Sequence, residues 1–200
     1  MQVTSAGPAV VKSVRQRQLL NAWLRLFGKV HGLPDVTAYE IDRLDDEKPD
    51  MMIYVVSYDG GAPRYKSTFE GQRLIDAFGT VAQGRFLDEV LGPERAPAII
   101  PIYDECVRHC RPSYSVRRVA DVDGRQVDYE RLLLPFGRER HVENIIAFFK
   151  TISEDGAFQQ RDLMRPGGAP AVHSIHVLID QVEDAKRAHR GTSLADIVEI

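Results

Sequence analysis

Three small groups of residues have the side-chain types and spacing that a ligand or a reaction would need. The first consists of Cys106, His109 and Cys110. On a helix, residues 106 and 110 share a face and residue 109 lies beside it, so two thiols and an imidazole could meet a zinc ion. A closed structural zinc site has four ligands, and only three are local here. The sequence therefore favours buried cysteines and no metal site, with a haem or metal sensor built on His109 or Cys106 as an alternative.

The second group, His173 and His176, has the spacing of a ligand pair on a helix. The metalloprotease motif places a glutamate between two such histidines, and no glutamate lies between these. Both residues stand at the start of an amphipathic pattern over residues 172–188. We therefore expect them to be ordinary surface histidines on a helix.

The third group is the sequence Tyr129-Glu130-Arg131, inside an apolar run typical of a β-strand. Side chains alternate along a strand, so Tyr129 and Arg131 share one face and Glu130 lies on the other. A buried charge is costly unless it is paired. Two interpretations stay open: Arg131 makes a cross-strand ion pair with a nearby acid, or it anchors an anionic ligand such as a carboxylate. The candidate acids are Asp121, Asp123 and Glu143.

Motifs that mark known classes of catalyst are absent from the sequence. It holds no phosphate-binding glycine loop, no nucleophile-elbow serine and no protein-kinase motif. Only Asp128, Glu130 and His109 are plausible general acids or bases, and none has an evident partner. We therefore expect no catalytic residues and no enzyme, with a small α+β cavity enzyme of isomerase or dehydratase type as the alternative.

Composition narrows the classes further. The chain has 200 residues, of which 44% are hydrophobic and 28% are charged, and its 26 basic and 29 acidic residues give a net charge of −3. This balance indicates a folded protein without the basic surface of a nucleic-acid binder. No apolar stretch approaches the ~20 residues of a membrane span, and the N-terminus lacks the order of a secretory signal. Two cysteines cannot form a disulfide scaffold, so we expect a cytoplasmic protein.

Periodicity and turn residues predict an α+β fold. Strands are expected at residues 51–58, 64–69, 114–120, 127–134 and 144–152, and Asp59-Gly60-Gly61 is a hairpin turn between the first two. Helical patterns cover residues 10–27, 72–78, 86–90 and 97–110, with Pro101 near the start of the last helix. Hairpin-linked strands at both ends, with helices between them, indicate an antiparallel sheet with helices on one face.

The C-terminal part of the sequence differs in character. Residues 153–171 are polar and end in a proline- and glycine-rich stretch, which indicates a linker. The apolar stripe of the predicted helix that follows includes Ile175, Leu178 and Ile179. The predicted organisation is an arm and helix start at 1–18, a domain at 19–152, a linker at 153–171, and an amphipathic helix and tail at 172–200.

Seven short motifs in the predicted domain resemble those of a known family. They are Ala22-Trp23-Leu24, Leu33-Pro34, Phe78-Gly79, Gly84-Arg85-Phe86-Leu87-Asp88-Glu89, Arg111-Pro112-Ser113-Tyr114, Asp123-Gly124-Arg125 and Tyr129-Glu130-Arg131-Leu132-Leu133-Leu134-Pro135. In order and spacing they resemble the PAS_5 group of bacterial PAS-type sensory domains. The resemblance implies that the five predicted strands form one antiparallel sheet in the usual PAS order, with helices over one face.

The resemblance also implies a function. PAS-type domains hold a small ligand between the sheet and the helices, so we expect a stand-alone sensory module that acts by ligand binding, by protein contact, or by both. The ligand and any cofactor are unknown. Candidate cavity residues are Phe78, Phe86, Ile99, Tyr103, Cys106, Tyr129 and Arg131. The alternative is that these side chains fill the core and leave no cavity.

Flanking helices of PAS-type domains often pack on a second copy. The leading helix, with Leu20, Trp23 and Leu24, is therefore expected to pack on the sheet or in a homodimer. The predicted C-terminal helix, with its apolar stripe, is a second candidate surface for a protein partner. No nucleic-acid partner and no membrane span are expected.

Overall fold

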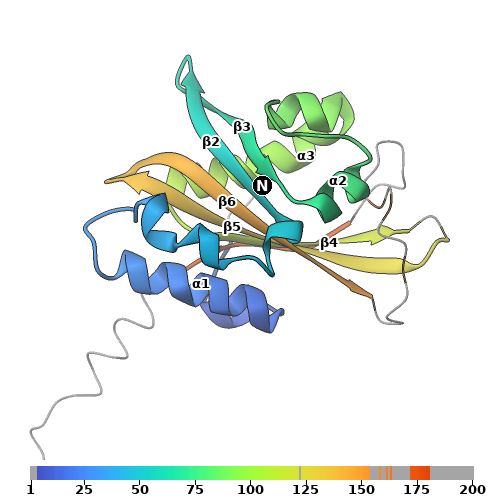
Figure 1. Cartoon of the computed structure of the whole chain (residues 1–200), viewed down its shortest axis with the longest axis horizontal. Helices are drawn as coiled ribbons and strands as arrows, with labels where there is room; N and C mark the ends of the chain where they lie inside the picture. The colour runs from blue at the N-terminus through green and yellow to red at the C-terminus, as the bar shows by residue number, and fades with distance from the viewer. Residues whose placement is uncertain are drawn as a thin grey trace, which may run out of the picture.

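A seven-stranded sheet, with strand order β1-β7-β4-β5-β6-β2-β3, forms the middle of the computed structural model (Figure 1). The structure describes residues 4–121, 123–153, 158, 161, 163 and 172–180. The strands are β1 Thr4–Ala6, β2 Met51–Asp59, β3 Ala62–Glu70, β4 Ser113–Ala120, β5 Gln126–Arg138, β6 His141–Ser153 and β7 Val172–Ile179. Strands β1 and β7 pair in parallel and every other pair is antiparallel.

The five strands predicted from the sequence all form, and they lie side by side in the order β4-β5-β6-β2-β3. The turn between β2 and β3 contains Gly60 and Gly61, whose φ angles are 56° and 88°. A two-residue hairpin turn of type I′ needs positive φ at both central positions, and glycine adopts it without steric cost. The fold class is therefore α+β and PAS-like, as expected, with two further strands at one edge.

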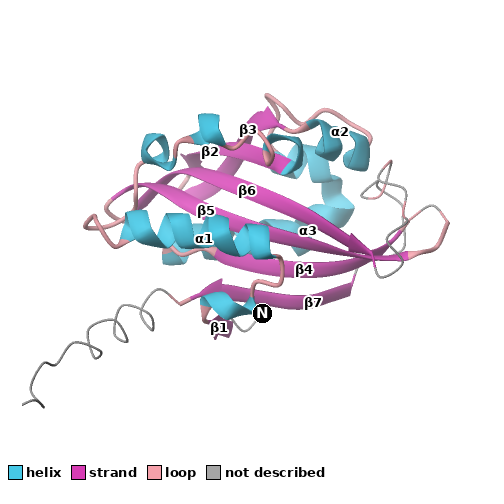
Figure 2. Cartoon of the chain, turned by 60° about the horizontal axis from the view of Figure 1, so that its bottom comes forward, coloured by secondary structure: helices cyan, strands magenta, loops and turns pink. Residues whose placement is uncertain are grey.

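Helices cover both faces of this sheet (Figure 2). They are α1 Val14–Phe27, α2 Gln72–Phe78 and α3 Leu87–His109, with short 3-10 turns at Pro8–Val10, Val36–Tyr39, Ile41–Arg43 and Lys48–Asp50. Helices α2 and α3 lie on one face, as expected, and α1 lies on the opposite face. The central strands are consequently buried on both sides, which explains their nearly continuous apolar sequence. None of the helices in the described part of the chain is long and apolar enough to cross a membrane.

Helix α1 packs on the sheet of its own chain. Trp23 has no exposed surface, and its indole Nε1 donates a hydrogen bond to the carbonyl oxygen of Pro135 in β5 at 2.8 Å. The Trp23 ring stacks on Phe27 with centroids 5.1 Å apart. Of the two arrangements left open for the leading helix, the structure shows the one in which it packs on the sheet.

The first turn of α1 is held by a buried carboxylate. Glu130 is fully buried in β5, and its Oε2 accepts a hydrogen bond from the backbone N–H of Ser13 at 3.3 Å. Ser13 is the N-cap residue of α1, and the partial positive charge at a helix N-terminus suits a carboxylate. Burial raises the pKa of Glu130, and the hydrogen bonds from Tyr114 and Ser13 oppose that rise.

Helix α3 begins earlier than predicted and passes through three prolines. It is kinked at Gly92, where φ is 69° and ψ is 175°. Pro93, Pro97 and Pro101 recur every four residues, and all three are exposed. The carbonyl groups that lack a partner because of these prolines lie towards the same side, where water can bind them. This placement explains why Pro101 does not mark the start of the helix.

The predicted C-terminal helix is wrong for residues 172–179, which form strand β7. Strand β7 pairs antiparallel with β4 on one side and parallel with β1 on the other. Apolar positions at 175, 178 and 179 suit a helix stripe, but the unpaired edge of β4 offers backbone hydrogen bonds that a separate helix would leave unused. Residues 181–200, where the rest of the predicted helix falls, lie outside the described residues, as does most of the predicted linker.

Substitution of Trp23 tests how α1 is held. Trp23→Phe keeps an aromatic ring but leaves the Pro135 carbonyl without its donor, so we expect the free energy of unfolding to fall by about 1–3 kcal/mol. Trp23→Ala should cost about 3–5 kcal/mol. Val14→Ala is the control, because Val14 is on the same helix and is 66% exposed. Denaturant unfolding measures all three, and equal effects for Trp23→Phe and Val14→Ala would contradict this account.

Candidate functional site

A small cavity lies between α3 and the sheet face that α3 covers. Its volume is about 20 Å³, which is room for a water molecule or a small polyatomic group. Aromatic and aliphatic side chains form most of its wall, and the charged lining residues are all arginines. The lining residues are Tyr54, Phe78, Leu87, Leu91, Arg95, Ile99, Tyr103, Arg117, Arg131 and Phe149.

Arg131 enters the cavity from β5 and has no acidic partner in the described part of the chain. It is 3% exposed, and its Nε and Nη1 atoms have no hydrogen-bond acceptor among the described residues. Its guanidinium lies 5.6 Å from the ring centroid of Tyr103 and 5.7 Å from that of Phe149. Cation–π contacts of this kind attract the charge weakly but supply no hydrogen-bond acceptor in the plane of the guanidinium.

The acids considered as ion-pair partners of Arg131 are used elsewhere. Asp121 and Asp123 form ion pairs with Arg125, and Glu143 forms one with Arg138. The interpretation of Arg131 as half of a cross-strand ion pair is therefore wrong. The physical reason is the register, since Arg131 stands opposite Ser115 in β4 and Phe149 in β6.

A second buried arginine that lacks a hydrogen-bond acceptor, Arg117, lies near Arg131. Arg117 in β4 is 7% exposed, and its Nε atom has no acceptor among the described residues. Burial, together with the nearby charges of Arg131 and Arg95, lowers the pKa of Arg117 to about 10. Each of these effects means that the protonated guanidinium is disfavoured where it stands.

The aromatic wall is rigid and tightly packed. Tyr103 of α3 meets Tyr54 of β2 edge to face, with centroids 5.4 Å apart and planes at 82°. Tyr65 of β3 lies 5.2 Å from the same ring, and its hydroxyl donates to Asp104 of α3 at 2.6 Å. These contacts tie α3 to β2 and β3, and so fix one side of the cavity.

The structure brings together only part of the predicted cavity set. Phe78, Ile99, Tyr103 and Arg131 line the cavity. Tyr129 is fully buried on the same face of β5, and its hydroxyl has no partner among the described residues. Cys106 lies deeper in the core, and Phe86 lies outside the cavity at the start of α3.

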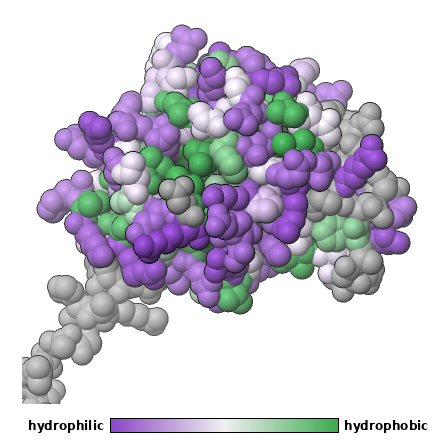
Figure 3. Space-filling view, in the orientation of Figure 1, coloured by the Kyte–Doolittle hydropathy of each residue, from purple (hydrophilic) through white to green (hydrophobic). Residues whose placement is uncertain are grey.

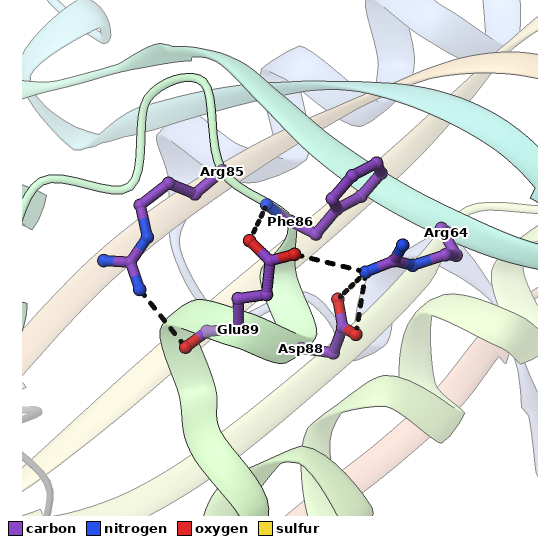
Figure 4. A network of polar contacts seen from close by, with 5 residues as sticks. All are labelled: Arg64, Arg85, Phe86, Asp88 and Glu89. Atoms are coloured by element: carbon purple, nitrogen blue, oxygen red, sulfur yellow. Dashed lines mark hydrogen bonds and ion pairs between the residues drawn. The ribbon is translucent and has the colours of Figure 1, made fainter.

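Phe86 belongs to a polar network that fastens the first turn of α3 to β3 (Figure 4). The Arg64 guanidinium lies 3.8 Å from the Phe86 ring centroid and forms ion pairs with Asp88 at 3.1 Å and Glu89 at 3.4 Å. Glu89 also accepts a hydrogen bond from the Phe86 N–H at 3.3 Å. The sequence motif over residues 84–89 is thus a structural clamp that positions Leu87 at the cavity wall.

The sequence interpretation missed Arg117. It therefore also missed that two arginines line the same cavity. Residues Ser113, Ser115 and Arg117 alternate along β4 and face the cavity side, a pattern that is visible in the sequence. The missing information was the register. Only the pairing of Arg117 with Tyr129 and of Ser115 with Arg131 places these side chains together.

A larger groove on the opposite face, of about 150 Å³, runs between α1 and β6 and is lined by charges of both signs. Arg15 is paired with Glu47 and Arg73 with Asp50 in this groove. Both arginines of the groove are thus paired with acids, unlike Arg117 and Arg131. The smaller cavity is therefore the better candidate site.

The cysteine and histidine group does not form a cluster of ligands. Cys106 is fully buried, and burial raises the pKa of its thiol. The thiol of Cys110 contacts the carbonyl oxygen of Arg140 at 3.2 Å, and His109 lies 3.1 Å from Glu105. Within the described residues, no group of three or more histidine, cysteine or acidic side chains could hold a metal ion.

His176 lies in strand β7, so the expectation of surface histidines on a helix is wrong. It stands opposite Ser115, and burial lowers the pKa of its imidazole. His173 stands opposite Arg117 across a shift in the β4–β7 register, and its side chain lies outside the described residues, so the predicted spacing of a ligand pair on a helix does not apply.

The three candidate acids and bases do not line the cavity. Asp128 pairs with Arg118 at 2.8 Å and with Lys12 at 3.7 Å, and the hydrogen bond from Arg118 lowers its pKa. Glu130 faces α1, and His109 lies at the C-terminal end of α3. The structure therefore does not support the cavity-enzyme alternative built on these residues.

The candidate interaction residues are mostly within the core. Leu20 and Trp23 have no exposed surface, Leu178 and Ile179 are buried, and Leu24 and Ile175 are half-buried. The face of the molecule shown in Figure 3 is mainly hydrophilic, with hydrophobic residues in scattered groups. A contact between copies through Leu20 or Trp23 would require α1 to leave the sheet.

Comparisons with known proteins return structural likenesses at low identity. A light-oxygen-voltage domain studied with a flavin analogue is 17% identical, with a TM-score of 0.41, and the match covers 57% of this chain and 85% of that one. The light state of the blue-light photoreceptor Aureochrome1 LOV is 13% identical, with a TM-score of 0.39 and coverages of 58% and 91%. An RNA-binding light-oxygen-voltage receptor is 17% identical, with a TM-score of 0.37 and coverages of 78% and 39%.

No family model matches the sequence, and no curated protein does. The resemblance to the PAS_5 group therefore stays a prediction. The PAS-like α+β fold follows from the strand order and the position of α3.

The unpaired arginines make a prediction about stability. Removing an uncompensated buried charge is favourable when an apolar side chain of similar length fills its place, so Arg117→Met and Arg131→Met should each raise the free energy of unfolding by about 1–3 kcal/mol. Arg118→Met is the control, because Arg118 is next to Arg117 but faces away and is paired with Asp128. It should lower stability by about 1 kcal/mol or less. Chemical unfolding in low salt measures the three variants, and a loss of several kcal/mol for Arg131→Met would show that Arg131 is paired inside the protein.

The clamp predicts a local effect. Arg64→Ala removes the cation–π contact and both ion pairs, so hydrogen exchange of residues 86–91 should become faster while exchange in the central strands changes little. Arg85→Ala is the control, because Arg85 contributes one long hydrogen bond of 3.4 Å to the network. Similar exchange in the two variants would argue against the clamp.

Proposed function

We propose that this chain is a cytoplasmic PAS-like sensory module, not an enzyme, that binds a small molecule in the cavity between α3 and the sheet. One observation carries the proposal: buried polar atoms of Arg117, Arg131 and Tyr129 point into an aromatic environment and have no partner among the described residues. Buried polar groups in folded proteins are nearly always hydrogen-bonded, and an exception needs a cause such as a missing ligand. Aromatic walls with a few convergent polar groups are also typical of small-molecule sites.

The cavity is connected to the opposite face of the sheet through one strand. Arg131 faces the cavity, and its neighbour Glu130 holds the first turn of α1 through the Ser13 N–H. A shift of β5 on ligand binding would therefore change the position of α1 or the strength of its docking. Recognition of α1 or of the surface around it by a partner protein would then report whether the ligand is bound.

A binding screen with a matched pair of variants tests this function. A fragment library of neutral, basic and acidic compounds is screened by ligand-observed NMR against the full chain. Ile99 and Ile102 are both buried in α3, but only Ile99 lines the cavity. We expect Ile99→Phe to abolish binding of the hits and Ile102→Phe to preserve it, since both substitutions overpack the core by a similar amount.

The control for folding is the circular dichroism spectrum of both variants. If no fragment binds the wild-type protein, or if Ile99→Phe leaves the hits bound, the cavity is not a ligand site.

A further inference from the structure

Arg117 and Arg131, which line the cavity, belong to a polar patch that spans three strands. Ser115 of β4 stands opposite Arg131 of β5 on one side and His176 of β7 on the other. Arg117 stands opposite Tyr129, and Arg117 and Ser115 lie on the same face because they are two residues apart. Directly opposed side chains in antiparallel strands lie about 4.5–5.5 Å apart at Cβ. The five side chains therefore form a single patch.

Most of the unpaired polar atoms in this patch are hydrogen-bond donors. The Nε atoms of both arginines and Nη1 of Arg131 have no acceptor, and the hydroxyls of Ser115 and Tyr129 also have no partner among the described residues. A guanidinium only donates, and a hydroxyl donates one hydrogen bond. Burial lowers the pKa of His176, which favours its neutral form. The patch is thus rich in donors and poor in acceptors.

The charge of the patch is also uncompensated. Arg117 and Arg131 form no ion pair among the described residues, and none of the residues that line the cavity is acidic. Two buried guanidinium groups close to each other repel, and each has lost its hydration. An anion between them would reduce the repulsion and would replace the lost hydration with hydrogen bonds.

The geometry of the donors limits the kind of anion. A guanidinium presents its N–H groups in a plane, and this fork matches two oxygens of a carboxylate or another oxyanion better than a spherical halide. The cavity of about 20 Å³ has room for a group of a few atoms. A larger acid would require the cavity wall to move, and two residues of that wall, Leu87 and Leu91, precede the kink at Gly92.

We propose that the cavity binds a small oxyanion, whose oxygens accept hydrogen bonds from Arg117 and Arg131 and from the hydroxyls of Tyr129 and Ser115. The chemistry is shared by short carboxylates and by inorganic oxyanions such as nitrate. This inference rests on the proposed sensory function and specifies its ligand class. The anion is the partner that neither β4 nor β5 supplies.

Titration of anions into the full chain tests the inference. Sodium formate, acetate, propionate and nitrate are compared with sodium chloride at one ionic strength, and acetamide serves as a neutral analogue of acetate. We expect at least one oxyanion to raise the melting temperature and to bind in calorimetry, while chloride and acetamide do neither. A response to the carboxylates alone or to nitrate alone supports the inference and tells the two sources apart.

Variants connect the binding to the arginines. Arg117→Met and Arg131→Met should each weaken oxyanion binding by about tenfold or more, and Arg118→Met should leave it unchanged. The readout is the anion-dependent shift of each variant, so a higher melting temperature without anion does not affect it.

Three outcomes would overturn the inference: no oxyanion exceeds chloride, acetamide acts like acetate, or the arginine variants bind as the wild type does. Neutral fragments that bind in the NMR screen and are lost in Ile99→Phe would preserve the sensory function in that case. Failure of the oxyanion inference can therefore be told apart from failure of the proposed sensory function.

Discussion

Two opposite charges stand next to each other in the central strand, and the geometry of a strand keeps them apart. Glu130 and Arg131 point to opposite faces of the sheet, so the carboxylate cannot neutralise the guanidinium beside it. Each side has to satisfy its own charge. On one side, the Glu130 carboxylate accepts hydrogen bonds from the Ser13 N–H, at the start of α1, and from Tyr114. On the other side the described residues provide aromatic rings and a second arginine.

This asymmetry gives the two layers of the molecule different roles. In the α1 layer, Trp23, Tyr39 and Gln16 each donate a hydrogen bond to a backbone carbonyl. The atoms without a partner there include oxygen acceptors of Gln16, Glu47 and Glu130. The α3 layer is closed by hydrogen bonds and ring contacts at its edge but leaves donors without acceptors at its centre. Such a centre lowers the stability of the free protein, and natural proteins accept this cost at sites that bind ligands.

Local patterns in the sequence were enough to predict the five central strands, the hairpin turn at Gly60 and the extent of α2. Two expectations failed where a distant segment decides the outcome. Residues 172–179 have apolar positions compatible with a helix, but they pair with β4. Arg131 was correctly identified as a buried charge, whereas Arg117 emerged only from the cross-strand register. A single sequence does not contain the register, because it depends on which strands become neighbours.

The pairing of β1 with β7 joins segments from opposite ends of the described chain. Hairpins such as β2–β3 close short loops, and their residues meet soon after the chain collapses. Strand β7 has to reach β4 across a much longer stretch of sequence, and non-local pairings of this kind slow folding. Since β7 contributes His176 to the polar patch beside Ser115, we expect this patch to be completed only when this edge of the sheet closes. The slow pairing of β7 with β4 would then also be the step that completes the site.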